Sequence, residues 1–344
     1  MDQRKTAASL EPPTCDDLPV WDTWMSVFHF PTLTVADELG LFPYLDKAPA
    51  SAEDVAKHFA LSPRATESLL GVLSSLGFVS QRGGTFYVTE VTRNFLLPES
   101  PYYWGGLLQL VRNIPFTHSS ILEALKKDQP IGYDGKDVWE THEINPEQAR
   151  AFTAAMHSHS FSAATGVARH GNFNGVKKLL DIGGGSACFP IALAQRYPDM
   201  RFTIMELPVV CTLAQSYAAD FGLADRIDTM AADMFRDAWP TGYDAVFFSN
   251  IFHDWDWKRC RHLAAQSFQI LPGGGRIYLH EMLLADTKDA PLTATSFSMN
   301  MMFFTLGKQF TAAELEALLK EAGFREISIV QTYGYYSLVS GRKP

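Results

Sequence analysis

The chain has 344 residues, of which 47% are hydrophobic and 19% charged, and its formal net charge is −9 at pH 7. This length predicts two domains with their own cores, and the acidic balance argues against nucleic acid or a membrane surface as the main partner. No run approaches the roughly 20 apolar residues of a membrane span, and the first residues lack the apolar core of a signal peptide. The four cysteines lie far apart without a Cys-x-x-Cys pair. We therefore expect a folded cytoplasmic protein without disulfides or structural zinc.

The N-terminal part combines a polar, proline-bearing start with an aromatic segment. Residues 1–18 predict a flexible arm. Residues 21–30 contain four aromatic side chains, Trp21, Trp24, Phe28 and Phe30. Solvent would not tolerate so dense an apolar surface, so we expect this segment to be buried, for instance against a second subunit.

Residues 33–97 have the pattern of a winged helix. Helical patterns are expected at 34–41, after a cap at Ser51, and from Pro63 to residue 76, followed by strands at 78–81 and 85–89. Winged helices often bind DNA, so a transcription regulator is the non-enzyme alternative. The helix that would enter the groove carries one arginine, Arg64, against one glutamate, Glu67. Because phosphate binding needs several cations, the sequence disfavours DNA binding.

The rest of the chain alternates strands and helices after a helical stretch. Helices are expected at 102–125 and 147–170, with a loop around residues 132–139 between them. Farther on, strands are expected at 177–182, 201–206, 226–231, 243–248 and 275–281, and helices at 187–196, 209–222, 257–271 and 311–322. Such alternation predicts a parallel sheet with helices on both faces. Only two residues separate the last strands, 326–332 and 335–340, which permits only an antiparallel hairpin.

A glycine turn between a strand and a helix indicates a ligand site. It reads Asp181-Ile182-Gly183-Gly184-Gly185-Ser186-Ala187, and glycines let the backbone approach a ligand or adopt positive φ. The next strands end in Glu206 and in Asp233-Met234. Carboxylates suit ribose hydroxyls and an exocyclic amine, and Met234 could cover an adenine face. The sequence thus describes an adenosine-like ligand, and no lysine of a phosphate loop suggests a triphosphate.

Six ordered motifs resemble one enzyme family. Besides the glycine turn they are Met205-Glu206-Leu207-Pro208, Ala232-Asp233-Met234-Phe235, Phe252-His253-Asp254-Trp255, Leu271-Pro272-Gly273-Gly274-Gly275 and Gly307-Lys308-Gln309-Phe310. Over nearly the whole chain they resemble S-adenosylmethionine-dependent methyltransferases of the plant caffeate and animal acetylserotonin O-methyltransferase type, in their bacterial natural-product branch. The resemblance implies an α/β fold. After the arm at 1–18, a mainly helical winged-helix domain at 19–170 would serve dimerisation and roof the acceptor. A domain at 171–344 with a doubly wound, mostly parallel seven-stranded sheet would bind S-adenosyl-L-methionine.

His253 is the expected catalytic base. It lies just past a buried strand, where polar residues of a parallel sheet face the ligand crevice. Methyl transfer requires alignment and removal of the acceptor's proton, and imidazole can accept a proton at neutral pH. By resemblance, Glu281 orients the imidazole, and Gln309 stands where the family has a second glutamate.

The remaining ligand contacts follow from the glycine turn and from the resemblance. The expected cofactor-binding residues are Asp181, Gly183, Gly185, Glu206, Asp233, Met234 and Ser249. The expected acceptor-binding residues are Phe152, Met156, His159, Asp254, Asn300 and Phe303, with Trp24 and Phe28 beside them. Such a pocket suits a flat aromatic small molecule, methylated on a hydroxyl oxygen by a homodimeric enzyme.

Two departures from the family pattern leave alternatives open. Gln309 cannot balance an imidazolium charge, so His253 should be less biased toward protonation. Ser249 and Asn250 replace larger, often cationic residues. The competing reading is a C- or N-methyltransferase, including metal-assisted C-methylation of a 2-oxo acid. The nearest substitute for a further ligand histidine is Asn300, which binds iron or zinc poorly, so no metal is expected.

Overall fold

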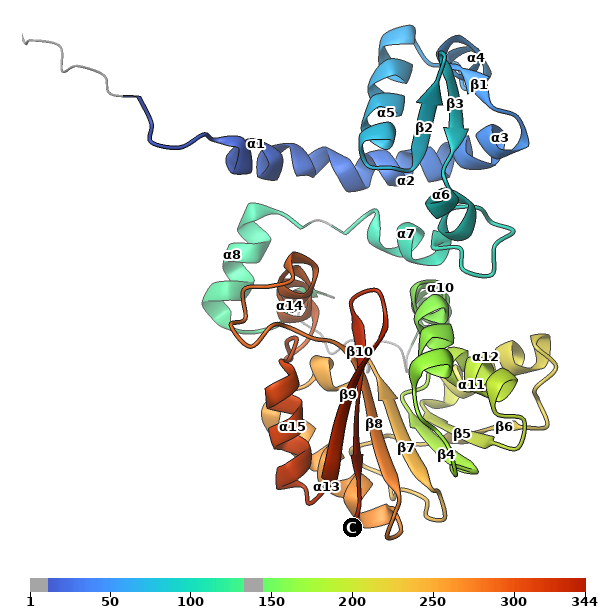
Figure 1. Cartoon of the computed structure of the whole chain (residues 1–344), viewed down its shortest axis with the longest axis vertical. Helices are drawn as coiled ribbons and strands as arrows, with labels where there is room; N and C mark the ends of the chain where they lie inside the picture. Colours follow the sequence, from blue (N-terminus) through green and yellow to red (C-terminus); the bar gives the residue numbers. More distant parts are fainter. Residues whose placement is uncertain (1–11, 115, 133–144) are drawn as a thin grey trace, which may run out of the picture. The chain divides into compact units, whose positions relative to one another are not determined.

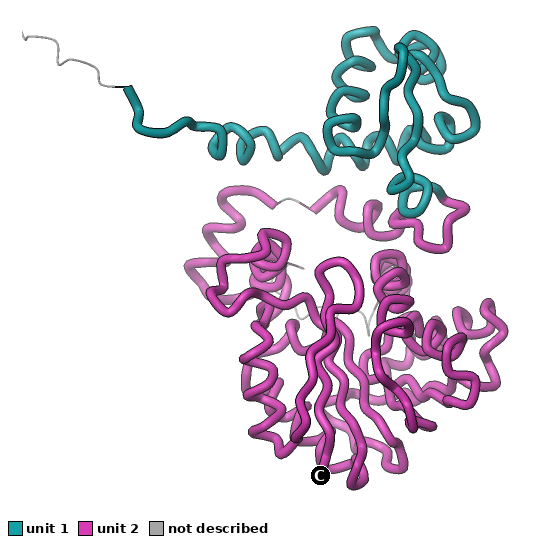
Figure 2. Tube along the Cα trace, viewed as in Figure 1, with its two compact units in different colours: residues 1–97 teal, residues 98–344 magenta. Residues whose placement is uncertain are grey.

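The structure is a computed structural model that describes residues 12–114, 116–132 and 145–344. The chain forms two compact units, which divide between Leu97 and Pro98 (Figure 2). The arm expected at 1–18 lies outside the described residues as far as residue 11. The loop expected around 132–139 lies outside them from residue 133 onward.

The first unit is the predicted winged helix. Its elements are α1 (Leu18–Met25), a 3₁₀ turn (Ser26–Phe28), α2 (His29–Leu39), α3 (Leu41–Lys47), β1 (Ala50–Ser51), α4 (Ala52–His58), α5 (Pro63–Ser75), β2 (Val79–Arg82), β3 (Thr85–Val88) and α6 (Glu90–Phe95). The three strands pair antiparallel in the order β1-β3-β2. Ser51 caps α4 as predicted, because its hydroxyl accepts the Asp54 N–H at 3.2 Å.

The aromatic segment at 21–30 is exposed within the described chain. Trp21, Trp24 and Phe28 keep 50%, 60% and 58% of their surface accessible. The expected burial is therefore not achieved by this chain alone. Cover by a second copy stays a proposal.

Among the described residues, three helices precede the sheet of the second unit, α7 (Gly105–Val111), α8 (His118–Lys127) and α10 (Pro146–His170). The single helical stretch expected at 102–125 is wrong, because two helices occupy it. The sequence has Pro115 between them, and proline lacks the N–H that a helix interior requires. The long helix expected at 147–170 is confirmed, and the Asn145 side chain accepts the Glu147 N–H at its start.

A seven-stranded sheet in the order β6-β5-β4-β7-β8-β10-β9 forms the centre of the second unit (Figure 1). Its strands are β4 (Lys178–Ile182), β5 (Arg201–Glu206), β6 (Ile227–Ala231), β7 (Ala245–Ser249), β8 (Arg276–Met282), β9 (Arg325–Tyr333) and β10 (Tyr336–Arg342). The strands from β6 to β8 pair in parallel, whereas β10 pairs antiparallel with both of its neighbours. The doubly wound, mostly parallel sheet and its terminal hairpin are thus confirmed.

Helices cover both faces of this sheet (Figure 1). One face, which carries Phe247, is buried by α10, by α11 (Cys188–Arg196) and by α12 (Pro208–Asp220). The opposite face carries Phe248 and is buried by α13 (Trp257–Ile270) and α15 (Ala312–Glu321). Neighbouring strand residues point to opposite faces, so a sheet covered twice requires continuous apolar strands. In the described part of the chain, no helix is long and apolar enough to cross a membrane.

The division between the units lies earlier than the expected boundary at 170. α10 packs on α11, α12 and β9, and its Phe161, Ala164 and Val167 belong to the core of the sheet. Because α10 completes one buried face of the sheet, the second unit already begins at Pro98.

Candidate active site

The glycine turn after β4 has a conformation that few other sequences can adopt. Gly183 has a φ of +68° and Gly185 a φ of +52°, in the region that side chains disfavour. Gly184 faces the Asp181 carboxyl so closely that a Cβ would overlap it. The Asp181 Oδ2 atom is buried and has no hydrogen-bond partner among the described residues. Burial, and then the nearby Glu206, raise the pKa of Asp181. A buried carboxyl oxygen without a partner fits a ligand that brings hydrogen-bond donors.

The ends of the neighbouring strands bring further predicted cofactor-binding residues to the same edge. Glu206 ends β5, and its Oε2 accepts the Leu207 N–H at 2.7 Å. Burial raises the pKa of Glu206 to about 7. The Met234 methyl group lies 3.6 Å from where a Cβ on Gly183 would be. Ser249 ends β7, the strand that pairs with β4 on its other side.

Asp233 supports the turn that carries Met234. Its Oδ1 accepts the Phe235 N–H at 2.7 Å, and its Oδ2 lies 3.4 Å from Arg236 Nε. The sequence placed Asp233 in the ligand site. In the structure its carboxylate is engaged mainly by its own turn.

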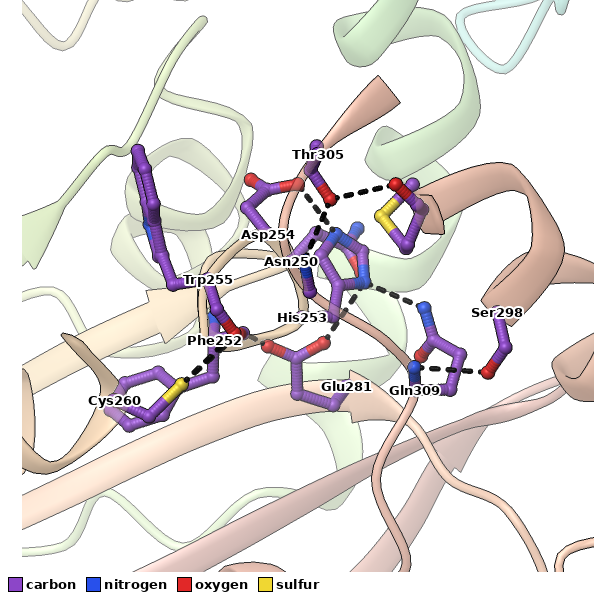
Figure 3. A network of polar contacts seen from close by, with 12 residues as sticks. Asn250, Phe252, His253, Asp254, Trp255, Cys260, Glu281, Ser298, Thr305 and Gln309 are labelled. Atoms are coloured by element: carbon purple, nitrogen blue, oxygen red, sulfur yellow. Dashed lines mark hydrogen bonds and ion pairs between the residues drawn. The ribbon is translucent and has the colours of Figure 1, made fainter. Parts of the chain in front are cut away.

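His253 lies at the centre of a buried polar network on the 3₁₀ turn Phe252–Asp254 (Figure 3). Its Nδ1 is 2.8 Å from Gln309 Nε2 and 3.3 Å from Glu281 Oε2. Its Nε2 is 3.6 Å from Asp254 Oδ1. The structure therefore brings together the three residues that the sequence placed in catalysis, although 56 positions separate His253 from Gln309.

Burial dominates the electrostatics of this network. It lowers the pKa of His253 to about 3; the hydrogen bond between His253 and Gln309 opposes this shift, and the charge of His159 adds to it. Burial raises the pKa of Glu281 to about 8, and burial and then Glu281 raise the pKa of Asp254. At neutral pH the imidazole is consequently unprotonated, as a proton acceptor must be.

The surrounding backbone fixes the position of His253. Glu281 Oε1 accepts the Phe252 N–H at 3.0 Å, which anchors the turn to β8. Gly307 packs against the His253 carbonyl so closely that any side chain at position 307 would overlap it. Ser298 Oγ accepts the Gln309 N–H at 3.1 Å. The Gly-Lys-Gln-Phe motif is therefore a backbone platform for the histidine turn.

The acceptor-binding residues predicted on α10 share one helical face, because Phe152, Met156 and His159 are spaced by four and three positions. The His159 ring packs on Trp104 with centroids 6.2 Å apart. His159 is also close enough for its charge to affect His253. Trp24 and Phe28, expected beside them, belong to the first unit and are exposed there.

The contact on α14 (Leu292–Phe304) differs from the expectation. The Phe297 ring meets the His253 ring edge-on, with centroids 5.2 Å apart, although Phe297 was not among the predicted residues. Asn300 lies one turn farther along the same face, and this spacing could have identified Phe297. Phe303 packs on Phe116 and Phe304.

The fold and the site together define a class of protein. A doubly wound sheet with a terminal hairpin, a glycine turn and a buried histidine beyond the fourth parallel strand define a methyltransferase of the Rossmann-like class. No group of three or more His, Cys, Asp or Glu that could hold a metal ion occurs within residues 12–114, 116–132 and 145–344.

Comparisons with known proteins identify the family. The O-methyltransferase domain family matches residues 124–325, and the O-methyltransferase dimerisation domain family matches residues 23–98. The chain belongs to the O-methyltransferase family. It is an S-adenosylmethionine-dependent methyltransferase whose winged-helix unit is a dimerisation domain.

Three relatives illustrate the range of this similarity. The chain is 34% identical to 3-hydroxy-5-methyl-1-naphthoate 3-O-methyltransferase of Streptomyces sahachiroi, over 91% of both chains. It is 28% identical to L-tyrosine C(3)-methyltransferase of Streptomyces lavendulae, over 86% of this chain and 83% of the relative. The solved structure of PigF with SAH is 26% identical, with a TM-score of 0.79 over 96% of this chain and all of the other.

Proposed function

We propose that the enzyme transfers a methyl group from S-adenosylmethionine to a hydroxyl oxygen of an aromatic small molecule, with His253 as the general base. The observation that carries this proposal is the buried His253, bonded through Nδ1 to Gln309 and placed beside Glu281. The relative that methylates a naphthoate hydroxyl supports an aromatic acceptor.

The carboxyl edge of the sheet would bind the methyl donor. The second oxygen of Glu206 would accept ribose hydroxyls, Asp181 Oδ2 would accept hydrogen bonds from the ligand, and Met234 would cover the adenine. When bound, S-adenosylmethionine supplies a methyl group on a cationic sulfur, which leaves as a neutral thioether when the new bond forms. The chain's own task is to align the acceptor and remove its proton.

Base action by Nε2 requires the proton of the neutral imidazole to sit on Nδ1. Glu281 Oε2 and the Gln309 amide oxygen are both buried without a hydrogen-bond partner among the described residues. A half-turn of the Gln309 amide exchanges its nitrogen and oxygen without moving other atoms, so that the oxygen can accept from Nδ1–H. The Nε2 lone pair is then free for the acceptor's proton, and Glu281, whose Oε2 lies 3.3 Å from Nδ1, helps to hold the ring in this orientation.

The acceptor would lie between α10 and α14, against Phe152, Met156 and Phe297, with Asn300 as a polar contact. A second copy of the chain would cover the exposed aromatic segment at 21–30, which makes the enzyme a homodimer.

A labelled methyl donor tests the chemistry. We expect purified enzyme to transfer a ¹³C-methyl group to hydroxylated aromatic acceptors, and to give methoxy carbon signals in the NMR spectrum of the product. Acceptors with the hydroxyl already methylated should not react. A label on ring carbon would contradict O-methylation and favour the chemistry named for the tyrosine relative, which also starts from a phenol. A label on nitrogen would contradict it as well.

Gln309→Glu should move the acidic limb of the kcat–pH profile upward. A carboxylate beside Nδ1 stabilises the imidazolium and so raises the pKa of His253, by at least about one pH unit. The base is then lost to protonation at a higher pH than in the wild type, where burial holds its pKa near 3. Gln309→Met, of similar volume but without an acceptor, should lower kcat without raising this limb. Equal acidic limbs in Gln309→Glu and wild type would contradict the contact between residue 309 and His253 Nδ1.

A further inference from the structure

Ser249 is bonded on its buried side to a second histidine that the mechanism does not use. Ser249 Oγ lies 2.9 Å from His280 Nδ1, and His280 Nε2 lies 3.2 Å from Thr332 Oγ1 on β9. The imidazole is fully buried. Tyr336 stacks on it with centroids 4.8 Å apart, and Phe189 of α11 packs at 5.0 Å. His280 therefore has a fixed position and two defined hydrogen-bond partners.

The chain of hydrogen bonds has one consistent direction. Thr332 Oγ1 donates its only hydrogen to the Tyr336 carbonyl at 3.3 Å, so it can only accept from His280 Nε2–H. Burial lowers the pKa of His280 to about 3, so the ring is neutral and carries a single N–H. Nδ1 must then accept the Ser249 hydroxyl hydrogen. The Ser249 oxygen is left with lone pairs only.

Ser249 lies at the edge assigned to the methyl donor. β7 pairs with β4 so that Phe247 is opposite Asp181, which brings Ser249, two residues on, level with Gly183. Ile251, two residues farther, lies next to Gly183 as well. His280 is on β8 directly opposite Ser249.

We propose that His280 and Thr332 are positioning residues that fix Ser249 as a hydrogen-bond acceptor for the methyl donor. This rests on the proposed contact between Ser249 and the donor. S-adenosylmethionine offers hydroxyl and ammonium hydrogens, and an oxygen that presents only lone pairs binds such groups. A serine free to rotate could instead present its own hydrogen to the ligand.

Thr332→Val tests the direction of these hydrogen bonds at a residue that is two hydrogen bonds away from Ser249. Valine has the shape of threonine but cannot accept from Nε2–H, so the proton is free to move to Nδ1 and reverse the Ser249 bond. We expect the dissociation constant for S-adenosylhomocysteine, measured by calorimetry, to rise about 3- to 10-fold. Thr332→Ser retains the hydroxyl and should bind as the wild type does.

Ring-nitrogen NMR of ¹⁵N-histidine protein reads the tautomer independently of affinity. With the His280 signals assigned by their loss in His280→Gln, the wild type should show a protonated Nε2 and an unprotonated Nδ1. Thr332→Val should shift the proton toward Nδ1. A wild-type ring protonated on Nδ1 would overturn the proposal even if Thr332→Val does not fold.

Ser249→Ala separates this inference from the proposed function. It should weaken S-adenosylhomocysteine binding, and Thr332→Val should add nothing further in that background. Unchanged binding in Ser249→Ala would remove the donor contact itself. Weakened binding there, together with equal affinities in Thr332→Val and Thr332→Ser, would leave the contact and overturn only the role of His280 and Thr332.

Discussion

His253→Ala is expected to lower kcat by at least about 100-fold, because a positioned general base typically contributes that much or more to a proton transfer. The effect should appear in kcat, since His253 removes the acceptor's proton and does not hold the methyl donor. Binding of S-adenosylhomocysteine by the variant, measured by calorimetry, should stay near the wild-type value.

The matched control is His262→Ala, which removes an exposed histidine from α13. It should retain wild-type turnover. Near-normal kcat in His253→Ala would mean that alignment alone supports catalysis. A parallel loss of donor binding would instead indicate that the turn Phe252–Asp254 had moved.

The sequence predicted the fold well because its local signals agreed with the tertiary structure. Leu179, Leu180 and Ile182 are apolar, as expected of a strand that is covered on both faces. Two of the glycines that follow, Gly183 and Gly185, have the positive φ values that favour glycine. The two-residue connection expected at 333–334 allowed only a hairpin. The hairpin forms, with its connection at 334–335. The single helix expected at 102–125 was wrong because the sequence has Pro115 within that stretch, and proline lacks the N–H that a helix interior requires.

The contacts across the site could be predicted only in part. Only the family resemblance predicted that His253, Glu281 and Gln309 share one site. No local sequence pattern links a turn, a strand and a loop when His253 and Gln309 are 56 positions apart. Because neighbouring residues of a strand point to opposite faces, His280 and Glu281 of β8 point away from each other. Alternation could not predict the contact between His280 and Thr332. That contact depends on β10, which pairs between β8 and β9 and so sets the distance between those two strands. Phe297 was not predicted because the apolar residues of α14 suit a core and a pocket equally well.

Glu206→Gln is expected to weaken S-adenosylhomocysteine binding about 10- to 100-fold, the range for losing a hydrogen bond to a charged group. The carboxylate already accepts the Leu207 N–H, and its second oxygen is the proposed acceptor for ribose hydroxyls. An exposed carboxylate on α15, Glu321, provides the control, and Glu321→Gln should bind as the wild type does. Wild-type affinity in Glu206→Gln would remove the ribose contact.

The same carboxylate predicts how donor binding depends on pH. Burial raises the pKa of Glu206 to about 7, so the free enzyme holds a protonated, neutral side chain at pH 6 and a carboxylate at pH 8. A ligand that donates hydrogen bonds selects the ionised form, so the affinity of the wild type for S-adenosylhomocysteine should rise between these pH values. In Glu206→Gln the dependence of this affinity on pH should become weaker. The dependence that is left comes from Asp181, whose pKa is raised too. An equal slope in both proteins would assign the titration to Asp181 and leave Glu206 out of ligand binding.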